Sequence, residues 1–435
     1  MSDIHDTKNL AVNGSELGLA SMRADTDRDL GRADHRSIRY IRVALEADVA
    51  PPRQQRPPIA VAFALDRSGS MGSGKMELAR AAVITALQRL EPTDRFAISV
   101  FDDRVDVVAE AGPATPKAIE RARRALERIE PRGSTALYDG WHAAARQLTR
   151  QPDAKGVARC VVVTDGQANV GPSAPESLAE AARELRRRGV VTTTLGIGAD
   201  FQEELLGVMS RAGGGQFYYV QRAEQLDAVL QAEIGEAMEV IAHGVTLRLC
   251  PSPGVDLQLM SDFPSEWTGT HLAVEVGDLI SGQQLDLLVA ARLPAAAMGE
   301  TASVEVCATD ADGPIELPIQ TVGWQLAPDH VNDRQPRAPA VTRLAAEVIA
   351  AQALLGTLRF NRRGDFGAVK HKLDEAIAEV RGLDDSDVEV ARHVRALLEA
   401  RERLTQYVDE RELKAHYLAG TSASRSKRPD GRSRR

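Results

Sequence analysis

Cysteine, aromatic residues and long apolar runs are scarce in this chain of 435 residues. Its three cysteines, Cys160, Cys250 and Cys307, are widely spaced in apolar, strand-like segments. We therefore expect buried free thiols rather than disulfides, and a reducing compartment. Residues 1–30 contain no apolar signal core, and nowhere do about eighteen uncharged apolar residues run together. These absences predict a cytoplasmic protein with no membrane partner.

An excess of positive charge is also lacking. The net charge of −8 argues against a generic nucleic-acid binder, because binding to phosphates needs a concentrated positive face. Hydrophobic residues make up 43% and charged residues 27% of the chain, as in ordinary soluble proteins. Because aromatic residues contribute only 4%, we expect an aliphatic core. The length predicts about three structural units.

Residues 57–242 have the pattern of an α/β domain. Apolar runs such as residues 59–65 and 157–164 alternate there with stretches of helical spacing. Strands that are continuous apolar runs are buried on both faces, which is typical of a parallel sheet covered by helices. We therefore predict a doubly wound, Rossmann-like α/β domain.

Short alternating strands flank this domain on both sides. Residues 243–326 contain several such runs, divided by Gly and Pro, and predict a β-sandwich. Residues 37–56 contain one more alternating strand, residues 41–49, followed by a proline-rich stretch. We expect this strand to join the later sandwich, so that the α/β domain is inserted between strands of the sandwich.

The two ends of the chain have other patterns. Residues 1–36 lack periodicity and predict a flexible arm. Prolines in residues 327–340 predict a linker, and residues 341–418 have Ala and Leu at helical spacing, which predicts a helical bundle. Residues 419–435 are rich in Ser, Arg and Lys and predict a disordered basic tail, with contact to an acidic partner or RNA as the alternative.

Oxygen-bearing side chains follow two of the predicted buried strands. Asp66, Ser68 and Ser70 come directly after the first, Asp165 comes after the second, and Thr135 lies in a loop between them. Each signal alone fits an ordinary turn or helix cap. In doubly wound sheets, however, ligands bind at the carboxyl ends of the strands, where the strand order reverses. Because Mg²⁺ prefers about six oxygen ligands, the five residues together predict a Mg²⁺ site, with Mn²⁺ and Ca²⁺ as alternative ions.

These residues resemble the metal-ion-dependent adhesion site of the von Willebrand factor type A domain. In that family an Asp-x-Ser-x-Ser motif, a loop Thr and a later Asp form one site, and all five positions are matched here. The resemblance covers roughly residues 57–240 and is stronger to the bacterial and inter-alpha-trypsin-inhibitor-heavy-chain-like branch than to integrins. It implies that Ser68, Ser70 and Thr135 bind the ion directly and that Asp66 and Asp165 bind largely through water. The open coordination position would accept a carboxylate from a partner protein.

A second motif overlaps the first. Residues 69–76 fit the phosphate loop Gly-x4-Gly-Lys, but Met76 stands where a Ser or Thr should hold Mg²⁺. A serine nucleophile at Ser70 has no assigned His base, and the histidines are scattered without zinc-site spacing. We therefore predict a non-enzymatic scaffold that binds a protein through Mg²⁺, with the other units adding contacts, orienting the site or mediating self-association. The alternatives are a regulatory subunit of an ATPase or other enzyme complex, and a P-loop nucleotide hydrolase.

Overall fold

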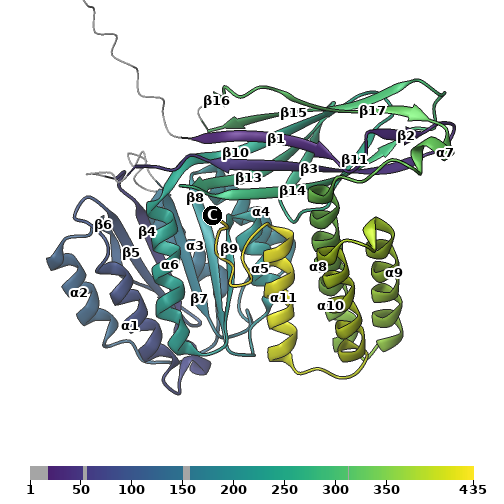
Figure 1. The fold of residues 1–435 in the computed structure, drawn as a ribbon. Coiled ribbons are helices and arrows are strands. Elements are labelled where there is room, and N and C mark those ends of the chain that lie inside the picture. The colour runs from purple at the N-terminus through teal and green to yellow at the C-terminus, as the bar shows by residue number, and fades with distance from the viewer. Residues whose placement is uncertain (1–17, 52–55, 150–156, 312) are drawn as a thin grey trace, which may run out of the picture.

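The computed structural model describes residues 18–51, 56–149, 157–311 and 313–435. These residues form an α/β domain, a β-sandwich and a C-terminal helical unit (Figure 1). The α/β domain and the helical unit lie side by side beneath the sandwich in this view, and α11 is the helix of that unit that lies next to the α/β domain.

The α/β domain has a six-stranded sheet of order β6-β5-β4-β7-β8-β9. Only β6 is antiparallel to its neighbour. The central strand β4 has every side chain buried, which explains its continuous apolar sequence. The strands are β4 (Ala60–Asp66), β5 (Arg95–Phe101), β6 (Val105–Pro113), β7 (Ala158–Thr164), β8 (Val190–Ile197) and β9 (Gly214–Val220).

Helices cover both faces of this sheet, so the predicted doubly wound α/β fold is confirmed. One apolar core joins a face of the sheet to α1 (Lys75–Leu87), α2 (Pro116–Leu126) and α6 (Leu226–Met238). The other face packs against α3 (Leu137–Thr149), α4 (Pro175–Arg187) and α5 (Glu203–Ala212). The chain leaves β4 for β5 on one side and returns to β7 on the other, which places the reversal of strand order beside β4.

The sandwich is built from strands on both sides of the α/β domain. Its sheets have the orders β1-β3-β14-β11 and β12-β13-β10-β15-β17-β2, with β16 paired to β15. β3 pairs with β14 from Ser37 opposite Leu293 to Glu46 opposite Gln284, which confirms that the α/β domain is inserted in the sandwich. The strands are β1 (Leu19–Thr26), β2 (Leu30–Arg32), β3 (Ser37–Ala47), β10 (Val240–Pro251), β11 (Asp256–Leu259), β12 (Ser265–Thr268), β13 (His271–Ile280), β14 (Gln284–Leu293), β15 (Thr301–Asp310), β16 (Gly313–Pro314) and β17 (Gln320–Ala327).

Four long helices form the C-terminal helical unit. They are α8 (Pro339–Arg362), α9 (Phe366–Asp384), α10 (Val388–Leu404) and α11 (Glu410–Ser424), preceded by the short α7 (Asp329–Asn332). Asp365, Asp387 and Asp409 cap α9, α10 and α11 by accepting backbone N–H groups. The helix α8 is long and apolar enough to cross a membrane, with a mean hydropathy of 1.3, but 67% of that window is buried inside the protein. It is the central helix of this unit, in contact with the other three.

The predicted flexible arm and linker are wrong over the residues that the structure describes. Residues 1–17 lie outside that part of the chain. From Leu19 onward the chain forms β1 and β2, and Leu19 and Met22 are buried in the sandwich core. Residues 327–340 contain α7 and the start of α8.

The predicted disordered tail is also wrong. The helix α11 continues to Ser424, and the chain then folds back over the junction of the three units. Arg425 Nη1 donates to the Gly215 carbonyl oxygen at 2.9 Å, and the Ser433 amide donates to Glu236 at 3.0 Å. The charge of this segment alone favours a solvated tail. The segment is ordered instead because its side chains and amides donate to acceptors that are distant in the sequence.

Candidate metal site

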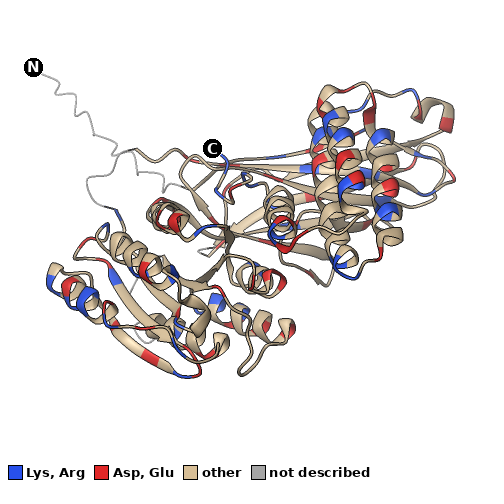
Figure 2. Ribbon diagram, turned by 90° about the horizontal axis from the view of Figure 1, so that it is seen from below, with Lys and Arg blue, Asp and Glu red and all other residues tan. Residues whose placement is uncertain are grey.

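The structure brings all five predicted residues to the carboxyl edge of the α/β sheet. Asp66 ends β4, and Ser68 and Ser70 lie in the turn that follows it. Asp165 follows β7, and Thr135 lies just before α3. Because the helix α6 runs back along the sheet into β10, this edge points away from the sandwich (Figure 1). Figure 2 views the molecule from below and so looks onto this edge.

The oxygen atoms of these side chains converge on one small space. Ser68 Oγ lies 3.0 Å from Ser70 Oγ, and Ser70 Oγ donates to Asp165 Oδ1 at 2.6 Å. A Cβ atom built on Gly166 would lie 3.0 Å from Thr135 Oγ1, 3.4 Å from Ser70 Oγ and 3.6 Å from Asp66 Oδ2. The three loops therefore present their oxygens to a common point, and Gly166 leaves that point open.

Burial differs across the cluster in a way that suits an ion. Asp66, Ser68, Thr135 and Asp165 are buried, whereas Ser70 is exposed. The protein therefore surrounds the space on its inner side and leaves it open to solvent at Ser70. An ion held there would keep coordination positions on the open side for water or for a ligand from another molecule.

Asp66 is a buried carboxylate whose ionisation the surroundings oppose. Burial raises the pKa of Asp66 from 3.8 to about 6, although Thr164 Oγ1 and the Ser68 amide donate hydrogen bonds to it at 2.5 and 2.7 Å. The neighbouring Asp165 carboxylate raises that pKa further. Two carboxylates and three hydroxyls are hard oxygen donors that fit Mg²⁺, whose positive charge would offset both carboxylates. In the described part of the chain, no group of three or more His, Cys, Asp and Glu side chains forms another candidate metal site.

The phosphate-loop alternative does not fit this geometry. The Lys75 ammonium group forms an ion pair with Asp165 Oδ2 and donates to the Ser70 carbonyl oxygen at 3.3 Å. A phosphate loop would aim its backbone N–H groups at a ligand. Here several of these N–H groups donate to oxygens of the protein instead. The donors are the backbone N–H groups of Ser68, Gly69, Met71, Gly72 and Lys75.

Sequence reasoning missed residues that join the loops after β4 and β5 to the loop before α3. Arg67 is buried and donates to Asp102 Oδ2 at 2.9 Å and to Asp106 Oδ2 at 2.5 Å. Arg132 also donates to Asp102 Oδ2, at 2.7 Å. Burial opposes ionisation of Asp102, but hydrogen bonds and these two guanidinium groups hold its pKa below the usual value. The position of Asp102 directly after β5 was the available signal, since a third strand ends there at the same edge.

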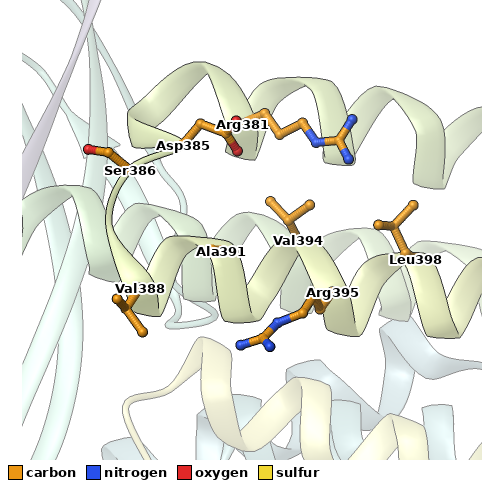
Figure 3. Close-up of a pocket in the computed structure, with 8 residues that line it drawn as sticks. All are labelled: Arg381, Asp385, Ser386, Val388, Ala391, Val394, Arg395 and Leu398. Carbon is orange, nitrogen blue, oxygen red and sulfur yellow. The ribbon is translucent and has the colours of Figure 1, made fainter.

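A pocket in the helical unit lacks this chemistry. A groove of about 550 Å³ runs between α9 and α10, with Val394 and Leu398 on one side, Arg381 across from them, and Asp385 near the turn that joins the two helices (Figure 3). On the ribbon, acidic and basic residues are intermingled over the helices of this unit (Figure 2). The groove gathers no set of oxygen ligands, so the edge of the sheet remains the candidate site.

The fold and the oxygen cluster define a doubly wound α/β domain of the kind that binds a ligand at the carboxyl edge of its sheet. Residues 60–232 match the family described as the von Willebrand factor type A domain, and this part of the chain is a domain of that family. Domains of this family bind divalent metal ions and commonly mediate protein–protein interactions.

Several known proteins are similar to this chain. The uncharacterised protein YfbK of Escherichia coli is 25% identical over 244 residues, which are 54% of this chain and 42% of YfbK. Inter-alpha-trypsin inhibitor heavy chain H3 of Homo sapiens is 28% identical over 207 residues, 46% of this chain and 23% of that protein. The chain thus spans less than half the length of both relatives. A von Willebrand factor type A structure from Catenulispora acidiphila superposes with a TM-score of 0.72 at 17% identity, over 94% of this chain and 98% of that one, and shows a shared fold.

Proposed function

We propose that the protein is a non-enzymatic scaffold that binds Mg²⁺ at this edge and through it captures an Asp or Glu side chain of a partner protein. The convergence of the five oxygen-bearing residues around one space, open at Ser70, is the observation that carries this proposal. An ion held from the inner side by protein oxygens has positions on its outer side for a carboxylate.

Electrostatics explains why the ion would be needed. Without it, a partner carboxylate would approach Asp66 and Asp165, and the Lys75 ammonium group, which pairs with Asp165, would offset part of that repulsion. A divalent cation reverses the local charge, so it both removes the repulsion and supplies a direct bond to the incoming oxygen. Affinity for the partner should therefore depend on the metal.

We place this function in the cytoplasm, because the cysteines of the chain are free thiols. Cys160 is buried, as predicted. Cys250 and Cys307 are only half-buried, which corrects the prediction for these two; they lie on the neighbouring strands β10 and β15.

Affinity purification tests the proposal. The wild-type chain and the variants Asp66→Ala and Ser68→Ala are immobilised, exposed to cell extract with Mg²⁺, and then washed with EDTA. We expect wild type to retain a partner that EDTA releases, and both variants to retain none, because each loses an oxygen donor to the ion. Retention that is indifferent to EDTA and to both substitutions would refute the proposal. A captured partner with ATPase or other enzymatic activity would support the regulatory-subunit alternative.

A further inference from the structure

The helix α11 binds a loop of the α/β domain through one buried lysine. Lys414 is only 2% exposed, and its Nζ donates to the Phe201 carbonyl oxygen at 2.6 Å and to Glu203 Oε2 at 2.6 Å. The same ammonium group lies 4.2 Å from the centre of the Phe201 ring. A buried ammonium group is costly unless it is paired and hydrogen-bonded, so these contacts define one position for the loop.

A second helix of the C-terminal unit holds the same carboxylate. Arg362, near the end of α8, forms ion pairs with Glu203 and with Glu410, the latter at 3.0 Å. Glu203 is the first residue of α5 and is buried. Two helices that are distant from α5 in the sequence therefore contact the β8–α5 connection, residues 198–202, at the end where α5 begins.

The other end of this connection borders the metal site. The Phe201 ring packs on Gly196, where a Cβ atom would lie 2.4 Å from the ring. Gly196 is the register partner of Thr164, whose hydroxyl donates to Asp66 Oδ2 at 2.5 Å. A Cβ atom on Gly198 would lie 4.0 Å from Lys75 Nζ, which pairs with Asp165.

We propose that Lys414 is a positioning residue: it holds Phe201 and Glu203, and thereby lets the C-terminal helical unit keep the metal site in its binding geometry. This inference rests on the proposed function, because it concerns the same site. When the contacts that support a site form before the ion binds, ordering the loops of the site costs no binding free energy, and the affinity for the ion is higher.

Calorimetric titration of the full chain with Mn²⁺ tests this inference. Lys414→Met removes the charge and keeps the length, Lys414→Arg keeps the charge, and Arg401→Met removes an ion pair with Asp374 that lies within the helical unit. We expect Lys414→Met to weaken Mn²⁺ binding roughly tenfold. Lys414→Arg should recover part of that loss, and Arg401→Met should bind as wild type does. If Lys414→Met does not fold, Phe201→Leu, which removes the ring from Gly196, should weaken binding in the same way.

The outcomes separate this inference from the function on which it rests. Wild type that takes up no Mn²⁺ would overturn the metal site itself. Wild-type affinity in Lys414→Met, accompanied only by a lower unfolding temperature, would show that the lysine merely stabilises the fold and would overturn the inference alone. Equal weakening in Arg401→Met would also overturn it, because the effect would then be a general loosening of the helical unit.

Discussion

Replacing Asp66 by Asn is expected to stabilise the metal-free protein by up to about 3 kcal/mol at pH 7 while it abolishes Mg²⁺ binding. Burial raises the pKa of Asp66 from 3.8 to about 6, so the folded state holds the proton more tightly than the unfolded state does. Stability is then lost as the pH rises from about 4 through about 6, and the full cost, about 1.4 kcal/mol per unit of pKa, is present at pH 7. An asparagine at this position stays neutral and avoids that cost.

Urea unfolding at several pH values checks this prediction. In EDTA, the advantage of Asp66→Asn over wild type should grow between pH 4 and pH 7. Excess Mg²⁺ should reverse the order at pH 7, because a ligand at about a thousand times its Kd adds about 4.1 kcal/mol to wild type alone, which exceeds the advantage of the variant. Asp256→Asn is the matched control, since that carboxylate is exposed and its ion pair with Arg292 contributes little. An Asp66→Asn variant less stable than wild type in EDTA at pH 7 would contradict the account that burial opposes the ionisation of Asp66.

Replacing Arg159 by Met is expected to lower the free energy of unfolding by about 3–5 kcal/mol, because it leaves a buried carboxylate without its partner. Glu233 on α6 is fully buried and accepts from Arg159 Nη1 at 2.5 Å, Thr193 Oγ1 at 2.7 Å and the Tyr218 hydroxyl at 2.9 Å. Burial alone would raise the pKa of Glu233, but Arg159 and the hydrogen bonds lower it below the usual 4.5. This cluster joins β7, β8 and β9 to α6.

The double variant Arg159→Met/Glu233→Met separates the ion pair from packing. It should be more stable than Arg159→Met, since no charge stays buried unpaired. A carboxyl whose pKa is lowered on folding contributes stability above its unfolded pKa and loses it as the pH falls through the folded value. Wild type should therefore lose stability below about pH 4.5, and the double variant should lose less. A double variant as unstable as the sum of the two single variants would contradict this assignment.

Local patterns in the sequence were sufficient for the central parts of the fold. The β4 strand is apolar throughout because both of its faces are covered, and β3 alternates because one of its faces lies in the sandwich core. The five site residues could be predicted because the carboxyl ends of parallel strands lie at a common edge, which makes position along the chain informative about position in space.

Features that depend on distant partners could not be read from the sequence. The strand β1 has few buried apolar positions and is stabilised by pairing with β3. The basic tail is ordered by acceptors on the α/β domain, such as the Gly215 carbonyl and Glu236. Likewise, the sequence alone suggests that Arg67 is exposed, because its partner Asp102 is distant in the sequence and lies beside it only in the folded protein.

Titration of the metal-stripped full chain with Mg²⁺ or Mn²⁺ tests the central claim most directly. We expect a single site in wild type, and loss of binding in Thr135→Ala because the Thr135 hydroxyl lies among the oxygens of the other loops. Ser134→Ala is the matched control, since this neighbouring hydroxyl belongs to an exposed residue outside the cluster, and it should bind as wild type does. Absence of uptake in wild type, or equal uptake in Thr135→Ala, would contradict the claim that these oxygens hold a divalent ion.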